Sequence, residues 1–119
     1  MMRLAWIGAG GALGSVMRAV LSVWIHGAVG GGRFPFGTLA VNVVGCLAIG
    51  LLSPWLRSDE ARAFLVIGVL GGFTTFSAFG SETWELFHGP APWLGGAYVA
   101  ASVGLGLAAV ALGRSLVAH

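Results

Sequence analysis

The chain has 119 residues, of which 57% are hydrophobic and only 8% are charged, and its mean hydropathy is +0.92. Soluble globular domains usually carry about 25% charged residues, so this composition excludes a soluble domain and equally excludes a disordered chain. The six basic residues are scattered arginines, and none of them forms a basic run that could follow a phosphate backbone. Composition therefore predicts an integral membrane protein and argues against a nucleic-acid partner.

Four apolar segments are long enough to cross the hydrocarbon core, which requires roughly 20 residues in a helix. A glycine-rich loop follows the first segment, a short polar stretch follows the second, and a His-Gly-Pro-Ala-Pro run ends the third. Tryptophans fall near the segment ends, as in the aromatic belts of membrane proteins. We therefore expect one all-α transmembrane domain over residues 1–119. Its four spans are predicted at about residues 4–25, 36–56, 63–87 and 93–117.

The first predicted span contains Gly10 and Gly14, and the third repeats this spacing at Gly68 and Gly72. Glycines four residues apart allow two helices to approach closely in lipid. A dinucleotide-binding interpretation is rejected because no strand precedes the run and no acidic residue follows at the required distance. Arg18 lies one turn beyond Gly14, where a charge is costly without a partner. It is either an interfacial anchor or a fixed positive charge that attracts anions.

The second predicted span carries Thr38 and Asn42, which share a helix face because they are four residues apart. An asparagine in hydrocarbon must be paired, so it either forms an interhelix hydrogen bond or offers a donor to a passing anion. The lone Cys46 excludes a disulfide framework and a cysteine metal cluster, and we interpret it as a small buried apolar residue.

The third predicted span contains an unusual stretch over residues 71–80, in which two glycines precede hydroxyl and aromatic residues. This composition makes a poor helix centre and predicts a break, and broken helices at membrane depth are typical of ion sites. Phe76 and Phe79 are three residues apart, and that spacing alone favours simple packing. Glu82 follows near the end of the span, where it is either solvated at the interface or has a pairing or gating role.

The fourth predicted span carries a short polar stripe, Tyr98 and Ser102, on an otherwise apolar helix. The three histidines have no metal-ligand spacing, and no nucleophile–base pair or acid dyad is visible, so we expect no enzyme. Most polar groups inside the spans are neutral donors, which suit an anion better than a cation. They are Thr38, Asn42, Thr74, Thr75, Ser77, Tyr98 and Ser102.

Three motifs together resemble the Fluc (CrcB-type) family of fluoride channels. The first runs from Gly10 to Arg18, the second is Thr38-Leu39-x-Val41-Asn42-x-x-Gly45, and the third is the Gly-Gly-Phe-Thr-Thr-Phe-Ser block that begins at Gly71. The resemblance covers the whole chain. It implies a passive fluoride channel that exports the ion and protects the cell from it. It also implies an antiparallel, dual-topology dimer in the plasma (inner) membrane of bacteria, with two pores that flank a central structural sodium ion.

The resemblance also implies roles for individual residues. Asn42 would line the pore, Phe76 and Phe79 would present ring edges to fluoride, and Tyr98 and Ser102 would be polar pore positions. Thr38 and Ser77 add hydroxyl donors, Arg18 matches the arginine of the first span, and the backbone carbonyls of Gly71 and Thr74 would bind sodium. Two positions depart from the family pattern, because relatives commonly carry a hydroxyl where this chain has Ala78 and Gly106.

The sequence leaves open the membrane orientation and the type of dimer, and it leaves two alternative functions to weigh. The arginine distribution favours cytoplasmic termini only weakly, so insertion in both orientations and a homodimer or a paired-gene heterodimer are all compatible with it. A small multidrug exporter has a similar size, but it would need a glutamate in the first span, which this chain lacks. A non-transporting membrane assembly subunit is the other alternative, and it would tolerate changes at Asn42, Phe76 and Phe79 without a transport defect.

Overall fold

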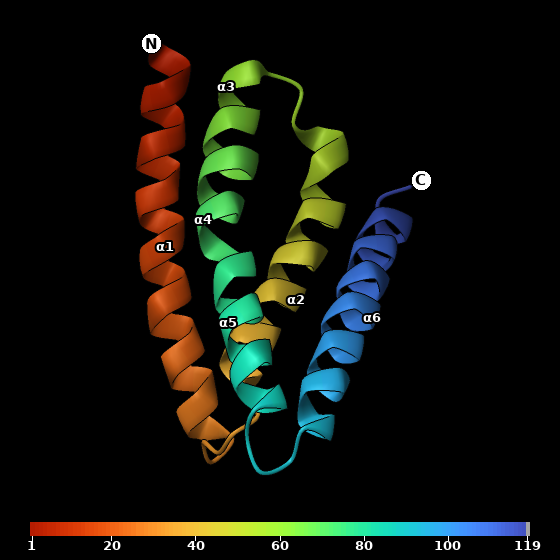
Figure 1. Ribbon diagram of the computed structural model, residues 1–119. Coiled ribbons are helices and arrows are strands. Elements are labelled where there is room, and N and C mark those ends of the chain that lie inside the picture. The colour runs from red at the N-terminus through yellow and green to blue at the C-terminus, as the bar shows by residue number, and fades with distance from the viewer. Residues whose placement is uncertain (119) are drawn as a thin grey trace.

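Four long apolar helices make up the structure, a computed structural model in which residues 1–118 are described (Figure 1). α1 covers Met2–Ala28 and α2 covers Phe36–Leu52, which continues as the short 3-10 turn η1 over Ser53–Trp55. α6 covers Trp93–Leu116. Each helix is long and hydrophobic enough to cross a bilayer, and the chain is a multi-pass membrane protein.

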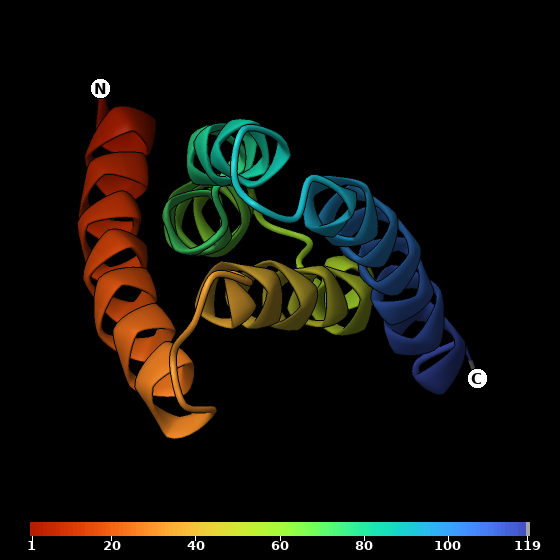
Figure 2. The ribbon, with the colours of Figure 1, turned by 60° about the horizontal axis from the view of Figure 1, so that its bottom comes forward.

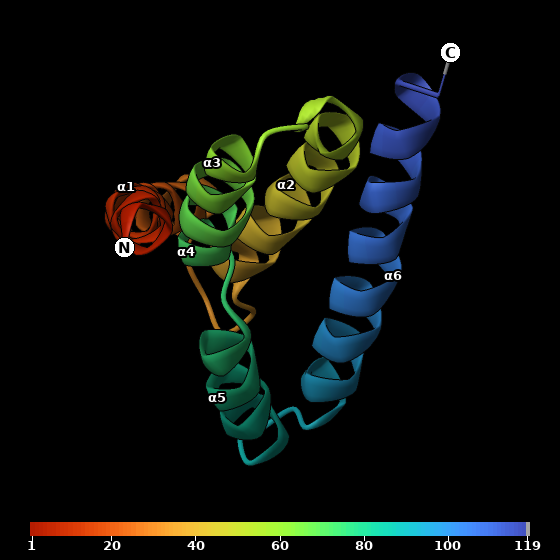
Figure 3. The same ribbon diagram turned by 90° about the horizontal axis from the view of Figure 1, so that it is seen from above.

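The third span is composite and runs from Asp59 to Phe87. It consists of α3 (Asp59–Ala61), the wider π-helix η2 (Arg62–Leu70), α4 (Gly71–Phe73) and α5 (Phe76–Phe87). Seen from above, α5 is set off to one side of α4 and is joined to it by an extended link (Figure 3). The predicted break in the third span is therefore confirmed.

The break itself consists of Thr74 and Thr75. Both have extended backbone, with φ −87° and ψ 159° at Thr74 and φ −150° and ψ 125° at Thr75. The Thr74 hydroxyl donates back to the Leu70 carbonyl at 2.9 Å, and the Thr75 hydroxyl accepts from the Ala78 amide at 3.2 Å. Thr75 is thus the N-cap of α5, a position that threonine favours because its oxygen satisfies a free helical amide.

Glycines set the spacing between α1 and the upper half of the third span. A Cβ on Gly14 would collide with the carbonyl of Val69, and a Cβ on Gly72 would lie 2.6 Å from the carbonyl oxygen of Gly11. α2 and α6 meet in the same way, since a Cβ on Gly113 would lie 2.8 Å from the carbonyl oxygen of Leu47. The predicted close packing at the paired glycines is confirmed.

The helix order in space places α2 centrally, between α1 and α6 (Figure 2). Both ends of the described chain lie at one end of the bundle, and the 29–35 and 88–92 loops lie at the other (Figure 1). Three consecutive glycines at positions 30–32 adopt positive φ in the first of these loops, which explains the glycine-rich run there.

Two ends of the spans differ by three or more residues from those expected from sequence. α1 continues through His26 to Ala28, three residues past the expected end at 25. The third span begins at Asp59 instead of 63, because the Ser58 side chain accepts a hydrogen bond from the Ala61 amide and caps a first turn that carries two acidic residues.

Candidate functional site

Asn42 on α2 holds the break in the third span. Its Nδ2 donates to the carbonyl oxygen of Thr75 at 3.1 Å, and its Oδ1 accepts from the Thr75 amide at 2.9 Å. This pair of bonds satisfies the backbone donor and acceptor that the break releases, as irregular backbone at membrane depth requires. A primary amide has two N–H donors, so one N–H of Asn42 is left for another acceptor.

Arg18 reaches the same region from α1. Its Nε donates to the carbonyl oxygen of Gly72 at 2.9 Å, and the contact is partly buried. Gly72 lies in the last turn before the break, where the carbonyl end of the half-helix carries a partial negative charge that a cation stabilises. Arg18 therefore has a hydrogen-bond partner at the break, which lowers the energetic cost of placing its charge inside the span.

A cavity of about 300 Å³, which we call the inner cavity, lies beside the break. Its lining combines an amide, hydroxyls and aromatic rings, and the Ser102 hydroxyl oxygen is buried without a hydrogen-bond partner in the described chain. A polar atom buried in this way is costly unless a ligand or water completes it. The residues that line the cavity are Asn42, Cys46, Thr74, Thr75, Phe76, Phe79, Ser102 and Val103.

A row of neighbouring aromatic rings continues from this cavity. The ring centroids of Phe76 and Phe79 are 5.6 Å apart, those of Phe79 and Tyr98 are 5.1 Å apart, and those of Tyr98 and Phe34 are 5.5 Å apart. Tyr98 is fully buried, whereas Phe76 is 82% exposed on the single chain. Phe34 was missed by the sequence analysis, although an aromatic residue beside Pro35 at the start of a span was a usable signal.

Thr38, Glu82 and Tyr98 form a polar cluster next to this row of rings. The Thr38 hydroxyl donates to Glu82 Oε2 at 3.1 Å across the α2–α5 contact. The Tyr98 hydroxyl adjoins both groups without reaching hydrogen-bond geometry. Glu82 Oε1 and the Tyr98 hydroxyl are both buried without a partner in the described residues. The cluster thus retains an unused acceptor and an unused hydroxyl.

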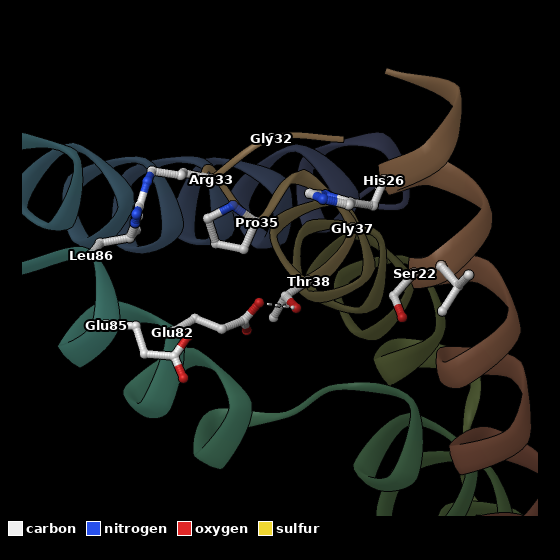
Figure 4. Close-up of a pocket in the computed structure, with 11 residues that line it drawn as sticks. Ser22, His26, Gly32, Arg33, Pro35, Gly37, Thr38, Glu82, Glu85 and Leu86 are labelled. Atoms are coloured by element: carbon white, nitrogen blue, oxygen red, sulfur yellow. Dashed lines mark hydrogen bonds between the residues drawn. The ribbon is translucent and has the colours of Figure 1, made fainter. Parts of the chain in front are cut away.

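An outer cleft of about 510 Å³ opens on the far side of this cluster (Figure 4). Glu82 extends from α5 toward Thr38 on α2, and His26 on α1 lies on the other side of Thr38. The cleft contains charged and polar groups at the end of the bundle where the 29–35 and 88–92 loops lie. Its lining residues are Ser22, Val23, His26, Gly32, Arg33, Pro35, Gly37, Thr38, Glu82, Glu85 and Leu86. Because the Thr38–Glu82 pair lines the outer cleft and Phe79 lines the inner cavity, the polar cluster lies between them.

Two further predicted site residues lie on the surface of the single chain. Ser77 is exposed on the first turn of α5, with its hydroxyl 3.4 Å from that of Thr75, and it is not among the residues that line the inner cavity. Gly71 is also exposed. In a continuous helix its carbonyl would accept from the amide of Thr75, but that amide donates to Asn42. The carbonyl of Gly71 is therefore released from its normal helical donor.

Comparison with known proteins gives consistent results. The family described as "CrcB-like protein, Camphor Resistance (CrcB)" matches residues 5–114. The chain is 47% identical over 112 residues to "Fluoride-specific ion channel FluC" of Rhizobium johnstonii, which covers 90% of this chain and 89% of that protein. The chain belongs to the CrcB/FluC family. Proteins of the same name from Agrobacterium fabrum and a Roseiflexus species are 46% and 43% identical over 125 and 120 residues.

The two further matches cover nearly the full length of both partners. They span 98% of this chain and 99% of the Agrobacterium protein, and 97% of this chain and 96% of the Roseiflexus protein. The expected membership of the CrcB/FluC family is confirmed, and the relatives are named as ion channels and not as enzymes.

Proposed function

We propose that this protein is a fluoride-selective passive channel through which the cell sheds fluoride. The observation that carries the proposal is the inner cavity beside the break, where an amide, hydroxyls and phenyl rings line one space. No carboxylate occurs among its described lining residues. Neutral donors and the positive edges of aromatic rings replace the water around a small anion without a bound counter-charge. Near-full-length relatives named fluoride-specific ion channels support the same ion.

Within this proposal, fluoride is held in turn by donors that the structure leaves unused. Asn42 offers its second amide N–H, and Ser102 offers a buried hydroxyl without a partner. Phe76 and Phe79 line the same cavity, and their ring edges would face the anion there. Arg18 adds a positive charge near the break and draws anions toward it. Removal of these groups in turn should slow the flux without changing the driving force.

The Thr38–Glu82–Tyr98 cluster is the proposed connection from the inner cavity to the outer cleft. The Thr38 and Tyr98 hydroxyls are donors to a passing fluoride, whereas the carboxylate of Glu82 repels it. Because Thr38 binds Glu82 Oε2, the carboxylate is held beside the path that the anion must follow. We assign Glu82 a gating role on this basis.

A second copy of the chain is the proposed partner. Phe76 is 82% exposed although it lines the cavity, and Ser77 and Gly71 are exposed beside it. In lipid these groups need a protein surface to complete the site. An antiparallel homodimer would cover them twice and give two pores, and a heterodimer with a homologous chain would do the same. Ser77 would then face the pore that its partner helps to enclose.

The proposed central ion is sodium, held by backbone carbonyls of Gly71 and Thr74. The residues fit this role because Thr75 donates its amide to Asn42, which frees the Gly71 carbonyl, and because the break turns the chain away from the helix at Thr74. Carbonyl oxygens suit a hard cation, and two from each subunit would make a set of four. In this role sodium would supply only charge and rigidity at the dimer centre.

The two alternatives make different predictions. A proton-coupled multidrug exporter needs a carboxylate at membrane depth in the first span, and residues 4–25 contain no aspartate or glutamate. An assembly subunit without transport needs no cavity of polar donors. The discriminating experiment is fluoride efflux from liposomes that contain the purified protein, measured with an electrode with and without a pH gradient. Efflux well above that of empty vesicles and independent of the gradient supports a passive channel. Efflux equal to that of empty vesicles overturns the proposal.

The ring edges have their own test. Phe76→Ile and Phe79→Ile keep apolar bulk but remove the positive ring edge, so each should cut fluoride flux while the oligomeric state in detergent is unchanged. Phe87→Ile is the matched control, since Phe87 lies at the far end of α5 and packs against Gly95 away from the cavity. Normal flux in both cavity variants would assign the rings to packing alone.

A further inference from the structure

α2 and α6 run in the same direction and place matching residues at three successive levels. Tyr98, Ser102 and Gly106 are one turn apart on α6 and share a face, as do Thr38, Asn42 and Cys46 on α2. The first level is Thr38 beside Tyr98, and the second is Asn42 with Ser102 in the inner cavity. We call this arrangement of three pairs the α2–α6 ladder.

The third level of the ladder joins Cys46 and Gly106. Gly106 is buried and has no side chain to offer, and the nearest atom to a Cβ built there is the Sγ of Cys46, at 3.4 Å. Cys46 also lines the inner cavity together with Asn42 and Ser102. A Cβ at 106 would therefore lie in van der Waals contact with the thiol. The thiol lies against the same cavity as the Ser102 hydroxyl oxygen, which is buried without a partner in the described residues.

We propose that Cys46 is a permeation-path residue whose S–H group donates to the anion at the third level of the ladder. The thiol supplies from α2 the donor that Gly106 does not supply from α6. The interpretation of Cys46 as a merely apolar residue predicts that it can be replaced by any side chain of its size. The proposal rests on the proposed channel function. It adds one hydrogen-bond donor to the fluoride path, one helical turn beyond Ser102.

The first test uses side chains of similar size in fluoride efflux from liposomes. Cys46→Ser keeps a donor and should keep the flux within about twofold, since a hydroxyl donates at least as well as a thiol. Cys46→Val removes the donor and should lower the flux about fivefold, the factor that corresponds to one neutral hydrogen bond. Equal flux in both variants would overturn the proposal.

The second test modifies the thiol of the wild-type protein chemically. Cys46 is the only cysteine in the chain, so methyl methanethiosulfonate modifies one site: the thiolate displaces methanesulfinate and forms a mixed disulfide. In wild-type liposomes this should abolish most of the fluoride flux, and dithiothreitol should restore it. Cys46→Ser should be insensitive. The double variant Cys46→Ser/Val44→Cys carries a thiol on another face of α2, at a residue that is exposed and outside the cavity lining, and should also be insensitive.

The outcomes separate the two proposals. If unmodified wild-type protein shows no fluoride flux, the channel function fails and the ladder with it. If wild-type flux is normal and a mass spectrum confirms complete modification of Cys46 without a change in flux, the channel function stands and the role of Cys46 is refuted. Loss of flux only in proteins that carry the thiol at 46 supports it.

Discussion

The bond pair between Asn42 and Thr75 allows a quantitative prediction. Asn42→Leu keeps the branched shape and the number of heavy atoms but removes the donor to the Thr75 carbonyl and the acceptor for the Thr75 amide. Hydrogen bonds between helices in membranes average about 0.6 kcal/mol and reach about 1.7 kcal/mol. Two such bonds at one backbone unit give a loss of roughly 1–3 kcal/mol in the free energy of unfolding. The same change removes the spare N–H from the cavity, so fluoride flux should fall as well.

Unfolding in mixed micelles with increasing dodecyl sulfate, followed by fluorescence of the five tryptophans, measures the loss in stability. Thr83→Val is the matched control in the same span, because the Thr83 hydroxyl donates only to the Phe79 carbonyl one turn earlier in its own helix. It should cost less than about 0.5 kcal/mol. If Asn42→Leu unfolds with the wild-type midpoint and slope, the break does not depend on Asn42, and the account of the site is wrong.

Three further changes test other parts of the account. Gly14→Val pushes a side chain into the backbone of η2, and it should lower the free energy of unfolding by about 1–3 kcal/mol in the same titration; unchanged stability would contradict the close α1–η2 contact. Arg18→Met removes the bond to the Gly72 carbonyl and should cost about 1.5–3 kcal/mol, the range for a bond from a charged group; a smaller loss in the titration than for Thr83→Val would refute it. Glu82→Gln keeps an acceptor for Thr38 but removes repulsion of about 1 kcal/mol, so liposome efflux should rise several-fold; a flux equal to wild type would argue against gating by Glu82.

Much of the fold could be predicted because lipid imposes strict rules on sequence. Four apolar runs, the prolines after the third run and the paired glycines at Gly10 and Gly14 each reflect a single physical requirement. The break was visible because Gly71 and Gly72 precede two β-branched threonines, a combination with low helix propensity. The helix boundaries were less accurate, since the cap by Ser58 and the continuation of α1 to Ala28 depend on local hydrogen bonds that the hydropathy pattern does not show.

The sequence indicated which residues belong to the candidate site, but not which atoms they contact. That Asn42 needed a partner followed from its chemistry, but its choice of the Thr75 backbone depends on the level at which α2 meets the break. For the same reason, the sequence left Arg18 open between an interfacial anchor and a fixed positive charge that attracts anions. Phe34 was missed because an aromatic residue in a loop has an ordinary structural explanation, and Cys46 was interpreted as a small apolar residue because it is an isolated cysteine in an apolar run. Only the packing of α2 against α6 places them beside Tyr98 and Gly106.

The central claim is that neutral donors and ring edges beside the break conduct fluoride. The most direct measurement compares fluoride and chloride efflux from the same liposomes, loaded with both ions and containing the wild-type protein. We predict rapid loss of fluoride while chloride is retained at the level of protein-free vesicles. Equal efflux of the two ions, or retention of both, would contradict it.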